Sequence, residues 1–178
     1  MSTQEKHKFK VTVIGDGGVG KTSLIQKFTQ GIFQEDYLKT IGAQVSKYTT
    51  KINDDKIYLL FWDIAGQDDF LFLRPTFYKA SDAAIIVYSL EENDLGKRSL
   101  LNIETWYKDI QEFCGTIPVV IFANKVDLIN LESLNKTKLQ QLVDDHNSLG
   151  YYITSAKTGQ GVDSAFKAII DILYSKSQ

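Results

Sequence analysis

The chain has 178 residues, of which 43% are hydrophobic and 24% charged, and its formal net charge is −2. This composition is ordinary for a globular protein with a full hydrophobic core, and the slightly negative charge argues against nucleic acid as a partner. Cys114 is the one cysteine of the chain, so we interpret it as a packing residue in a protein of a reducing compartment.

Short apolar runs alternate along the chain with stretches of helical periodicity. The pattern predicts a strand over 9–14 and a helix over 20–30. The turn 53–55 then joins strands 44–52 and 56–62 in an antiparallel hairpin. Further along, strands and helices alternate: strands 83–88, 119–123 and 151–154, and helices 97–114, 132–147 and 162–174.

This order predicts an α/β fold in which helices cover both faces of a six-stranded sheet. The sheet is mostly parallel and has one antiparallel edge strand. Because no repeat or linker interrupts the pattern, we expect residues 1–178 to form a single domain with short polar termini at about 1–7 and 175–178. Ligands of such sheets bind at the carboxyl ends of the strands, where the motifs below fall.

The first motif is a glycine-rich loop between the first strand and the first helix, Gly15-Asp16-Gly17-Gly18-Val19-Gly20-Lys21-Thr22. It matches the G-x-x-x-x-G-K-[ST] pattern in the expected strand-to-helix context. Glycines let backbone N–H groups surround phosphates, and the helix N-terminus adds partial positive charge. Lys21 can reach the β- and γ-phosphates and the Thr22 hydroxyl can bind Mg²⁺, so the motif predicts a P-loop NTPase fold.

A second motif, D-x-x-G-Q, follows the strand 56–62. Asp63 can hold Mg²⁺ through water, Gly66 can offer its N–H to a γ-phosphate, and Gln67 can orient an attacking water. Alone, the D-x-x-G part also fits an ordinary strand-ending turn. It gains weight only from the phosphate loop upstream.

Two further motifs follow the strands 119–123 and 151–154. In Asn124-Lys125-Val126-Asp127, the Asp127 carboxylate can accept hydrogen bonds from the N1–H and 2-amino groups of guanine, which adenine cannot supply. The Lys125 stem can lie over the base. In Ser155-Ala156-Lys157, a backbone N–H can bind the guanine carbonyl oxygen. Each tetrapeptide or tripeptide alone could be a plain loop, but their placement favours a guanine site.

In this order the four motifs resemble the Ras superfamily of small GTPases over residues 9 to about 174, and the Rab branch most closely. The resemblance implies that Thr40, in the aperiodic loop 31–42, binds Mg²⁺ and senses the γ-phosphate as part of switch I. It implies that Phe33 packs on the guanine face and that switch II covers about 63–78. The Mg²⁺ ligands are then Thr22, Thr40 and Asp63, and the catalytic residues are Gln67, Lys21, Thr40 and Gly66.

The GTP/GDP-binding set that follows from the motifs and the resemblance is Gly15, Asp16, Gly17, Gly18, Val19, Gly20, Lys21, Thr22, Ser23, Phe33, Thr40, Gly66, Asn124, Lys125, Asp127, Ser155, Ala156 and Lys157. The chain departs from Rab proteins at Val45, at Asp68-Asp69 and at Leu73-Arg74-Pro75. Arg74 and Arg98 are interpreted as surface or packing residues. With no arginine in the loop 31–42, we expect hydrolysis to be slow without a partner.

The sequence leaves two rival functions to consider, a P-loop ATPase or kinase and a GTP-binding scaffold. Asp127 argues against a P-loop ATPase or kinase, and the intact Gln67, Thr40 and Asp63 argue against a GTP-binding scaffold that does not hydrolyse, which stays the alternative. Apolar side chains of switch II either bind an effector or pack beneath the loop: Phe70, Leu71, Phe72 and Phe77.

The resemblance implies a monomer that meets a GTPase-activating protein, an exchange factor and effectors at the switch regions. No apolar run approaches the roughly 20 residues that span a bilayer. The chain ends Ser175-Lys176-Ser177-Gln178, without a cysteine for a prenyl group. We therefore expect a cytoplasmic protein that is either free or peripheral on a membrane through partners or a missing tail.

Overall fold

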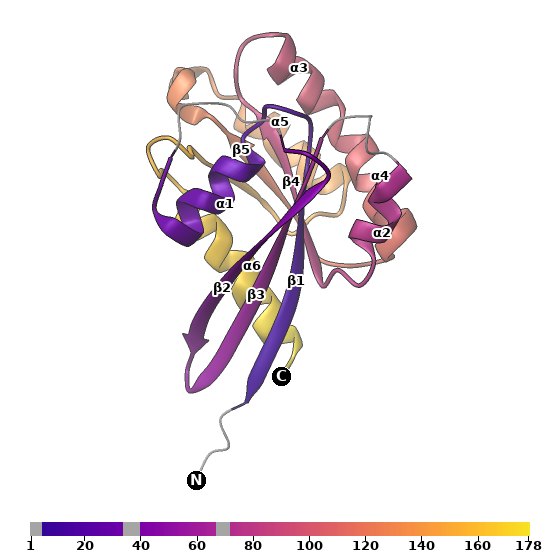
Figure 1. Ribbon diagram of the computed structural model, residues 1–178. Coiled ribbons are helices and arrows are strands. Elements are labelled where there is room, and N and C mark those ends of the chain that lie inside the picture. Colours follow the sequence, from indigo (N-terminus) through magenta and orange to yellow (C-terminus); the bar gives the residue numbers. More distant parts are fainter. Residues whose placement is uncertain (1–4, 34–39, 67–71) are drawn as a thin grey trace.

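The computed structural model describes residues 5–33, 40–66 and 72–178, and within them six strands form one sheet in the order β2-β3-β1-β4-β5-β6 (Figure 1). Only β2 runs antiparallel to its neighbour, β3; the other pairs are parallel. The predicted α/β fold with a mostly parallel sheet is therefore confirmed. The strands are β1 (Lys6–Ile14), β2 (Ala43–Ile52), β3 (Asp55–Ile64), β4 (Ala83–Ser89), β5 (Val119–Asn124) and β6 (Tyr151–Ile153).

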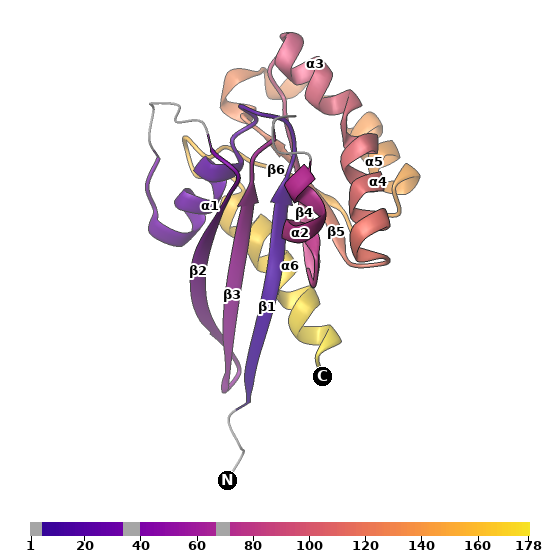
Figure 2. The same ribbon diagram turned by 45° about the vertical axis from the view of Figure 1, so that its right-hand side comes forward.

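Helices cover both faces of this sheet (Figures 1 and 2). On one face lie α1 (Lys21–Gln30) and α6 (Val162–Lys176). On the other lie α2 (Arg74–Tyr78), α3 (Asp94–Leu101), α4 (Ile103–Cys114) and α5 (Lys136–Asp145). Short 3₁₀ turns occupy Val126–Leu128 and Leu131–Ser133. In the described part of the chain, no helix is both long enough and apolar enough to cross a bilayer.

Two apolar clusters, one on each face, hold the layers together. Under α1 and α6, the ring of Phe166 stacks on Phe28 at 4.5 Å and meets Phe61 and Phe122 edge-on, each at 5.2 Å. Aromatic pairs of this kind stabilise a core beyond their buried area. Under α4, Trp106 and two isoleucines of the same helix pack against β4 and β5. Cys114 is partly buried and reduced, and its thiol contacts the carbonyl oxygen of Tyr78.

The helix boundaries differ from the prediction for local reasons. The stretch predicted as one helix over 97–114 begins earlier, because the Asn93 side chain caps it by accepting from the Gly96 N–H, and it is interrupted at Asn102. The helix predicted over 132–147 starts only after Asn135, which caps it in the same way. The five-residue α2 carries too short a periodicity to be predicted.

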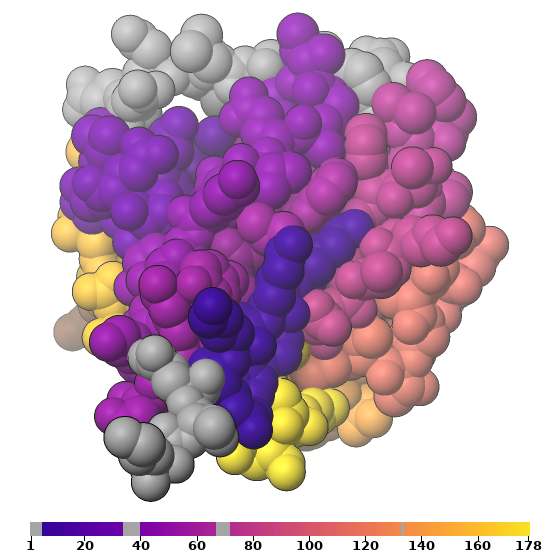
Figure 3. All heavy atoms as spheres, turned by 60° about the horizontal axis from the view of Figure 1, so that its bottom comes forward, coloured from indigo at the N-terminus to yellow at the C-terminus, as the bar shows by residue number. Residues whose placement is uncertain are grey.

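Figure 3 views the end of the molecule where β1 begins and α6 finishes, beside the β2–β3 hairpin. There the Tyr174 hydroxyl donates to Asp55 at 2.7 Å, and the Glu5 backbone N–H donates to the same carboxylate at 3.0 Å. The carboxyl ends of the parallel strands lie at the opposite end (Figures 1 and 2). All four motifs follow strands there, so the fold brings them to one edge of the sheet.

Candidate nucleotide-binding site

The loop 15–20 joins β1 to α1 and is packed so closely that two of its glycines admit no side chain. Gly15 has φ +139°, and a Cβ on it would lie 2.1 Å from the Val87 carbonyl oxygen. Gly20 has φ +99°, and a Cβ there would lie 2.4 Å from Asn124 Nδ2. Only glycine tolerates both the backbone conformation and the contact. The glycines predicted to shape the loop therefore also let it pack against β4 and the end of β5.

Lys21 begins α1 and is buried. Its Nζ donates to the carbonyl oxygens of Gly15 and Asp16, at 2.7 and 2.8 Å. Burial lowers the pKa of Lys21 to about 8, against the opposing charges of Asp63 and Asp16. The ammonium group is thus held within the curve of the phosphate loop, where an anionic ligand would stabilise its charged form.

Three hydroxyl and carboxyl side chains from separate segments meet beside Lys21. The Thr22 hydroxyl donates to Asp63 Oδ2 at 2.5 Å, and Thr40 Oγ1 lies 2.9 Å from Thr22 Oγ1 and 3.5 Å from Asp63 Oδ2. Asp63 is 2% exposed, and burial raises the pKa of its carboxyl group. Its Oδ1 is buried and, among the described residues, has no hydrogen-bond partner. An oxygen cluster with an unpaired buried carboxylate oxygen fits a hard cation such as Mg²⁺.

The segment after β3 lies directly on the phosphate loop. A Cβ on Gly66 would stand 2.1 Å from the Gly15 carbonyl oxygen and 2.6 Å from the Gly17 nitrogen. The Ala65 N–H donates to the carbonyl oxygen of Gly42 at 2.8 Å, which ties this segment to the one that carries Thr40. Gln67, Phe70 and Leu71 lie outside the described residues. Of the other apolar side chains predicted for switch II, Phe72 is 76% exposed, whereas Phe77 packs against the second cluster.

Asn124 joins three loops. Its Nδ2 donates to the Val19 carbonyl oxygen at 2.9 Å, and its Oδ1 accepts from the Thr154 hydroxyl and from the Ala156 N–H, each at 3.2 Å. The side chain is buried at the end of β5. It therefore fixes the phosphate loop relative to both loops that are predicted to hold guanine.

The other residues of the predicted base site lie around Asn124. Ser155 Oγ donates to Asp127 Oδ1 at 2.6 Å, and Asp127 is exposed. Lys125, in the left-handed region with φ 70°, donates to Glu91 Oε2 at 2.6 Å. Burial alone would raise the pKa of Glu91, but the hydrogen bonds from Lys125 and Ser89 lower it overall. Lys157 is exposed, and Phe33 is partly buried against the first cluster.

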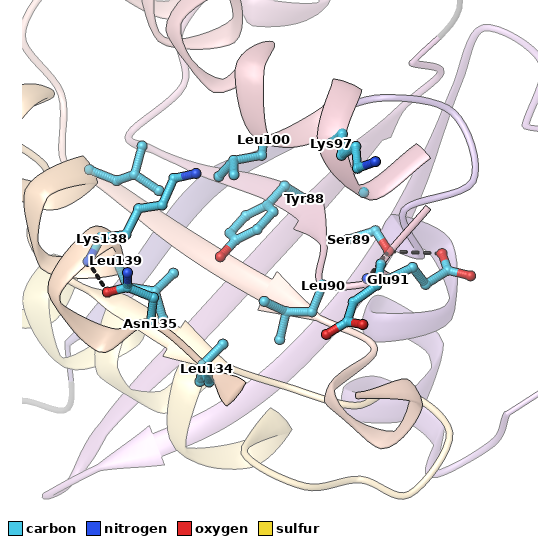
Figure 4. Close-up of a pocket in the computed structure, with 13 residues that line it drawn as sticks. Tyr88, Ser89, Leu90, Glu91, Lys97, Leu100, Leu134, Asn135, Lys138 and Leu139 are labelled. Atoms are coloured by element: carbon cyan, nitrogen blue, oxygen red, sulfur yellow. Dashed lines mark hydrogen bonds between the residues drawn. The ribbon is translucent and has the colours of Figure 1, made fainter. Parts of the chain in front are cut away.

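A cavity of about 280 Å³ borders this site between the end of β4, α3 and α5 (Figure 4). Leucine is the most frequent residue in its lining, with Tyr88 at its centre and Lys97 and Lys138 around it. Glu91 lines it as well, and so belongs both to the cavity and to the contact with Lys125.

The sequence did not predict the residues that bind the side chain of Asp16 and so support the phosphate loop. The Asp16 carboxylate binds Trp106, Asn102 and Arg98, which leaves the backbone of Asp16 for any contact with a phosphate. Glu91 was missed as well. The spacing of four residues between Arg98, Asn102 and Trp106 was a signal that these side chains share one helical face.

A protein-family model described as the Ras family matches residues 10–175. This chain belongs to the Ras family. It is 34% identical to the Ras-related protein Rab-13 of Bos taurus over 97% of this chain and 84% of the relative. It is 34% identical to the Ras-related protein Rab7 of Drosophila melanogaster over 95% and 82%, and 30% identical to the Ras-related protein Rab-7a of Paramecium octaurelia over the same shares. The predicted resemblance to Rab-like Ras superfamily GTPases is confirmed.

A pH dependence is expected from Lys21. We predict that the phosphates of a nucleotide bind its ammonium form, whereas the unliganded protein loses that proton above about pH 8. The affinity for GDP should therefore hold constant below this pH and fall about tenfold per unit above it. Titration calorimetry from about pH 7 to about pH 9 measures this slope. Guanosine, which lacks phosphates, controls for titration of the base, and a GDP affinity that stays flat would contradict the prediction.

Proposed function

We propose that this Ras-family chain is a molecular switch that binds GTP and GDP with Mg²⁺ and hydrolyses GTP slowly. The observation that carries the proposal is the meeting of Thr22, Thr40 and Asp63 beside Lys21. These residues come from α1, from the segment before β2 and from the end of β3. A site assembled from three segments can sense its ligand through all three.

For the base, the proposal rests on Asp127 and its neighbours. Ser155 holds one carboxylate oxygen of Asp127, which orients the group while the second oxygen can accept from guanine. Asn124 keeps the Ala156 N–H beside the same loop. Adenine would leave the second carboxylate oxygen of Asp127 without the donors that guanine supplies, so guanine is the favoured base.

For hydrolysis, the chain supplies positioning and charge. Lys21 and the N–H groups of the loop 15–20 stabilise negative charge on the transferring phosphoryl group, and we assign Gln67 to orient the attacking water. When bound, Mg²⁺ would neutralise phosphate charge, with Thr22, Thr40 and Asp63 holding it directly or through water. Gly66 packs closely against the phosphate loop, and we assign its backbone N–H to donate to a γ-phosphate.

Switching follows from the same contacts. Thr40 and Gly66 can bind a γ-phosphate only while it is present, so its loss would release switch I (33–42) and switch II (63–78). We propose that an activating protein, an exchange factor and effectors bind these segments. The Rab-like character favours a role in membrane trafficking or related signalling. A cytoplasmic location, with membrane contact through partners, fits this role.

Single-turnover hydrolysis of GTP tests the proposal. Phosphate release should be slow and dependent on Mg²⁺, and Gln67→Leu should slow it about tenfold or more, because the attacking water loses its orienting group. Gln140→Leu, an exposed change on α5, is the matched control and should leave the rate unchanged.

Two results would redirect the assignment. Tight GTP binding with equal rates in the wild type and Gln67→Leu would favour a GTP-binding scaffold. Competition by ATP as strong as that by GTP would contradict the role of Asp127.

A further inference from the structure

Asp16 of the phosphate loop is held by side chains of the helices packed behind the loop. Trp106 Nε1 donates to its Oδ1 at 2.8 Å, and Asn102 Nδ2 donates to its Oδ2 at 2.9 Å. Arg98 Nε lies 3.4 Å from the same Oδ2, with a side chain that is largely exposed. Asp16 and Trp106 are only 5% and 4% exposed, so water cannot replace the indole hydrogen bond. A shielded bond to a carboxylate is among the stronger hydrogen bonds in proteins.

The face of the same indole ring carries a cation from α2. The Arg74 guanidinium carbon lies 4.2 Å from the ring centroid of Trp106, and Arg74 Nη1 lies 3.3 Å from Asp109 Oδ2. Arg74 is buried and is the first residue of α2, seven positions after Gln67. Trp106 therefore contacts the phosphate loop with its ring edge and the end of switch II with its ring face.

The side chains that bind Asp16 come from both sides of the interruption between α3 and α4. Arg98, Asn102 and Trp106 follow one another at a spacing of four residues, which places them on one side of the helical path. The Trp106 N–H still donates to the Asn102 carbonyl oxygen at 3.0 Å, so the turn that sets their relative orientation is kept across the break. All three side chains reach the single carboxylate of Asp16.

We propose that Trp106 is a positioning residue that couples switch II to the phosphate loop. The proposal rests on the function proposed above. A nucleotide that displaces α2 moves Arg74 on the ring, and the ring moves Asp16 together with the loop around the phosphates. The coupling is reciprocal, so a partner that shifts α2 changes how firmly the loop holds GDP. Trp106 acts through Asp16 and not by touching the nucleotide.

The first test measures the rate at which a fluorescent GDP analogue leaves the protein. Trp106→Phe keeps an aromatic face for Arg74 but removes the N–H donor, and release should be about tenfold faster. Arg74→Gln removes the cation and should speed release about threefold to tenfold in the wild-type background. In the Trp106→Phe background, Arg74→Gln should not speed release further, because the hydrogen bond that links the ring to Asp16 is already absent. Multiplicative effects of the two changes would overturn the proposal.

The second test needs no nucleotide, so it tests the coupling through Trp106 separately from the proposed function. Hydrogen–deuterium exchange of the amides 16–20 in the unliganded protein should be faster in Arg74→Gln than in the wild type, but no faster in the double variant than in Trp106→Phe. Lys56→Gln removes another cation from an aromatic face, that of Tyr58 in the β2–β3 hairpin, and should leave this exchange unchanged. A wild type that binds no GDP would end the proposed function, while this exchange pattern still decides the coupling. Exchange unchanged in both single variants would overturn the coupling.

Discussion

Replacing Asn124 by alanine is expected to weaken GDP binding about 100-fold or more, because the loops on both sides of the nucleotide lose their common support. The change removes the hydrogen bonds to Val19, Thr154 and Ala156. Each such bond contributes about 1 kcal/mol, and the unpaired buried groups add to the loss, so the free energy of unfolding should also fall by about 2–4 kcal/mol. Titration calorimetry and urea denaturation measure the two effects.

Two further variants sharpen this test. Asn124→Asp keeps the oxygen that accepts from Ala156 but places a buried carboxylate oxygen against the Val19 carbonyl oxygen, so it should weaken GDP binding at least as much as the alanine variant. Asn135→Ala removes the cap of α5 and should cost about 1 kcal/mol of stability while leaving GDP affinity unchanged. If Asn124→Ala binds GDP as tightly as the wild type, the bridging role of Asn124 is wrong.

Gly66→Ala should slow GTP hydrolysis about 100-fold or more while it changes GDP affinity far less. The added Cβ would meet three backbone atoms of the phosphate loop, the nearest at 2.1 Å. The loop cannot retreat, because Val87, Asn124 and Trp106 hold it from other sides. The segment at Gly66 must therefore move away and lose the proposed contact with the γ-phosphate.

Gly115→Ala is the matched control for this change. Gly115 follows α4, has φ +67° and has no atom within 4 Å of an added Cβ, so the substitution costs backbone strain alone. It should lower stability by about 1 kcal/mol and leave single-turnover hydrolysis unchanged. A Gly66→Ala protein that hydrolyses GTP at the wild-type rate would show that this close packing does not hold the γ-phosphate contact.

The sequence predicted the features that depend on neighbouring residues and missed those that depend on contacts between residues far apart in the chain. The alternation of apolar strands and helices fixed the sheet, and the short motifs located Lys21, Asp63 and Asn124 at its edge, because both signals are local. The break at Asn102 could not be predicted, since the residue is compatible with a helix. Its hydrogen bond to Asp16 could not be predicted either, because it joins positions 86 residues apart. Likewise, the contact between Glu91 and Lys125 depends on the folded arrangement of two loops.

The placement of the chain ends has a practical consequence for handling this protein. β1 begins and α6 ends at the edge opposite the phosphate loop, where Tyr174 is fastened to the hairpin through Asp55 (Figures 1 and 3). A tether built onto the end of α6 would thus leave from the side remote from the phosphate loop. Protein immobilised there on a sensor surface would present the phosphate loop outward, so binders of each nucleotide state could be compared without blocking by the support.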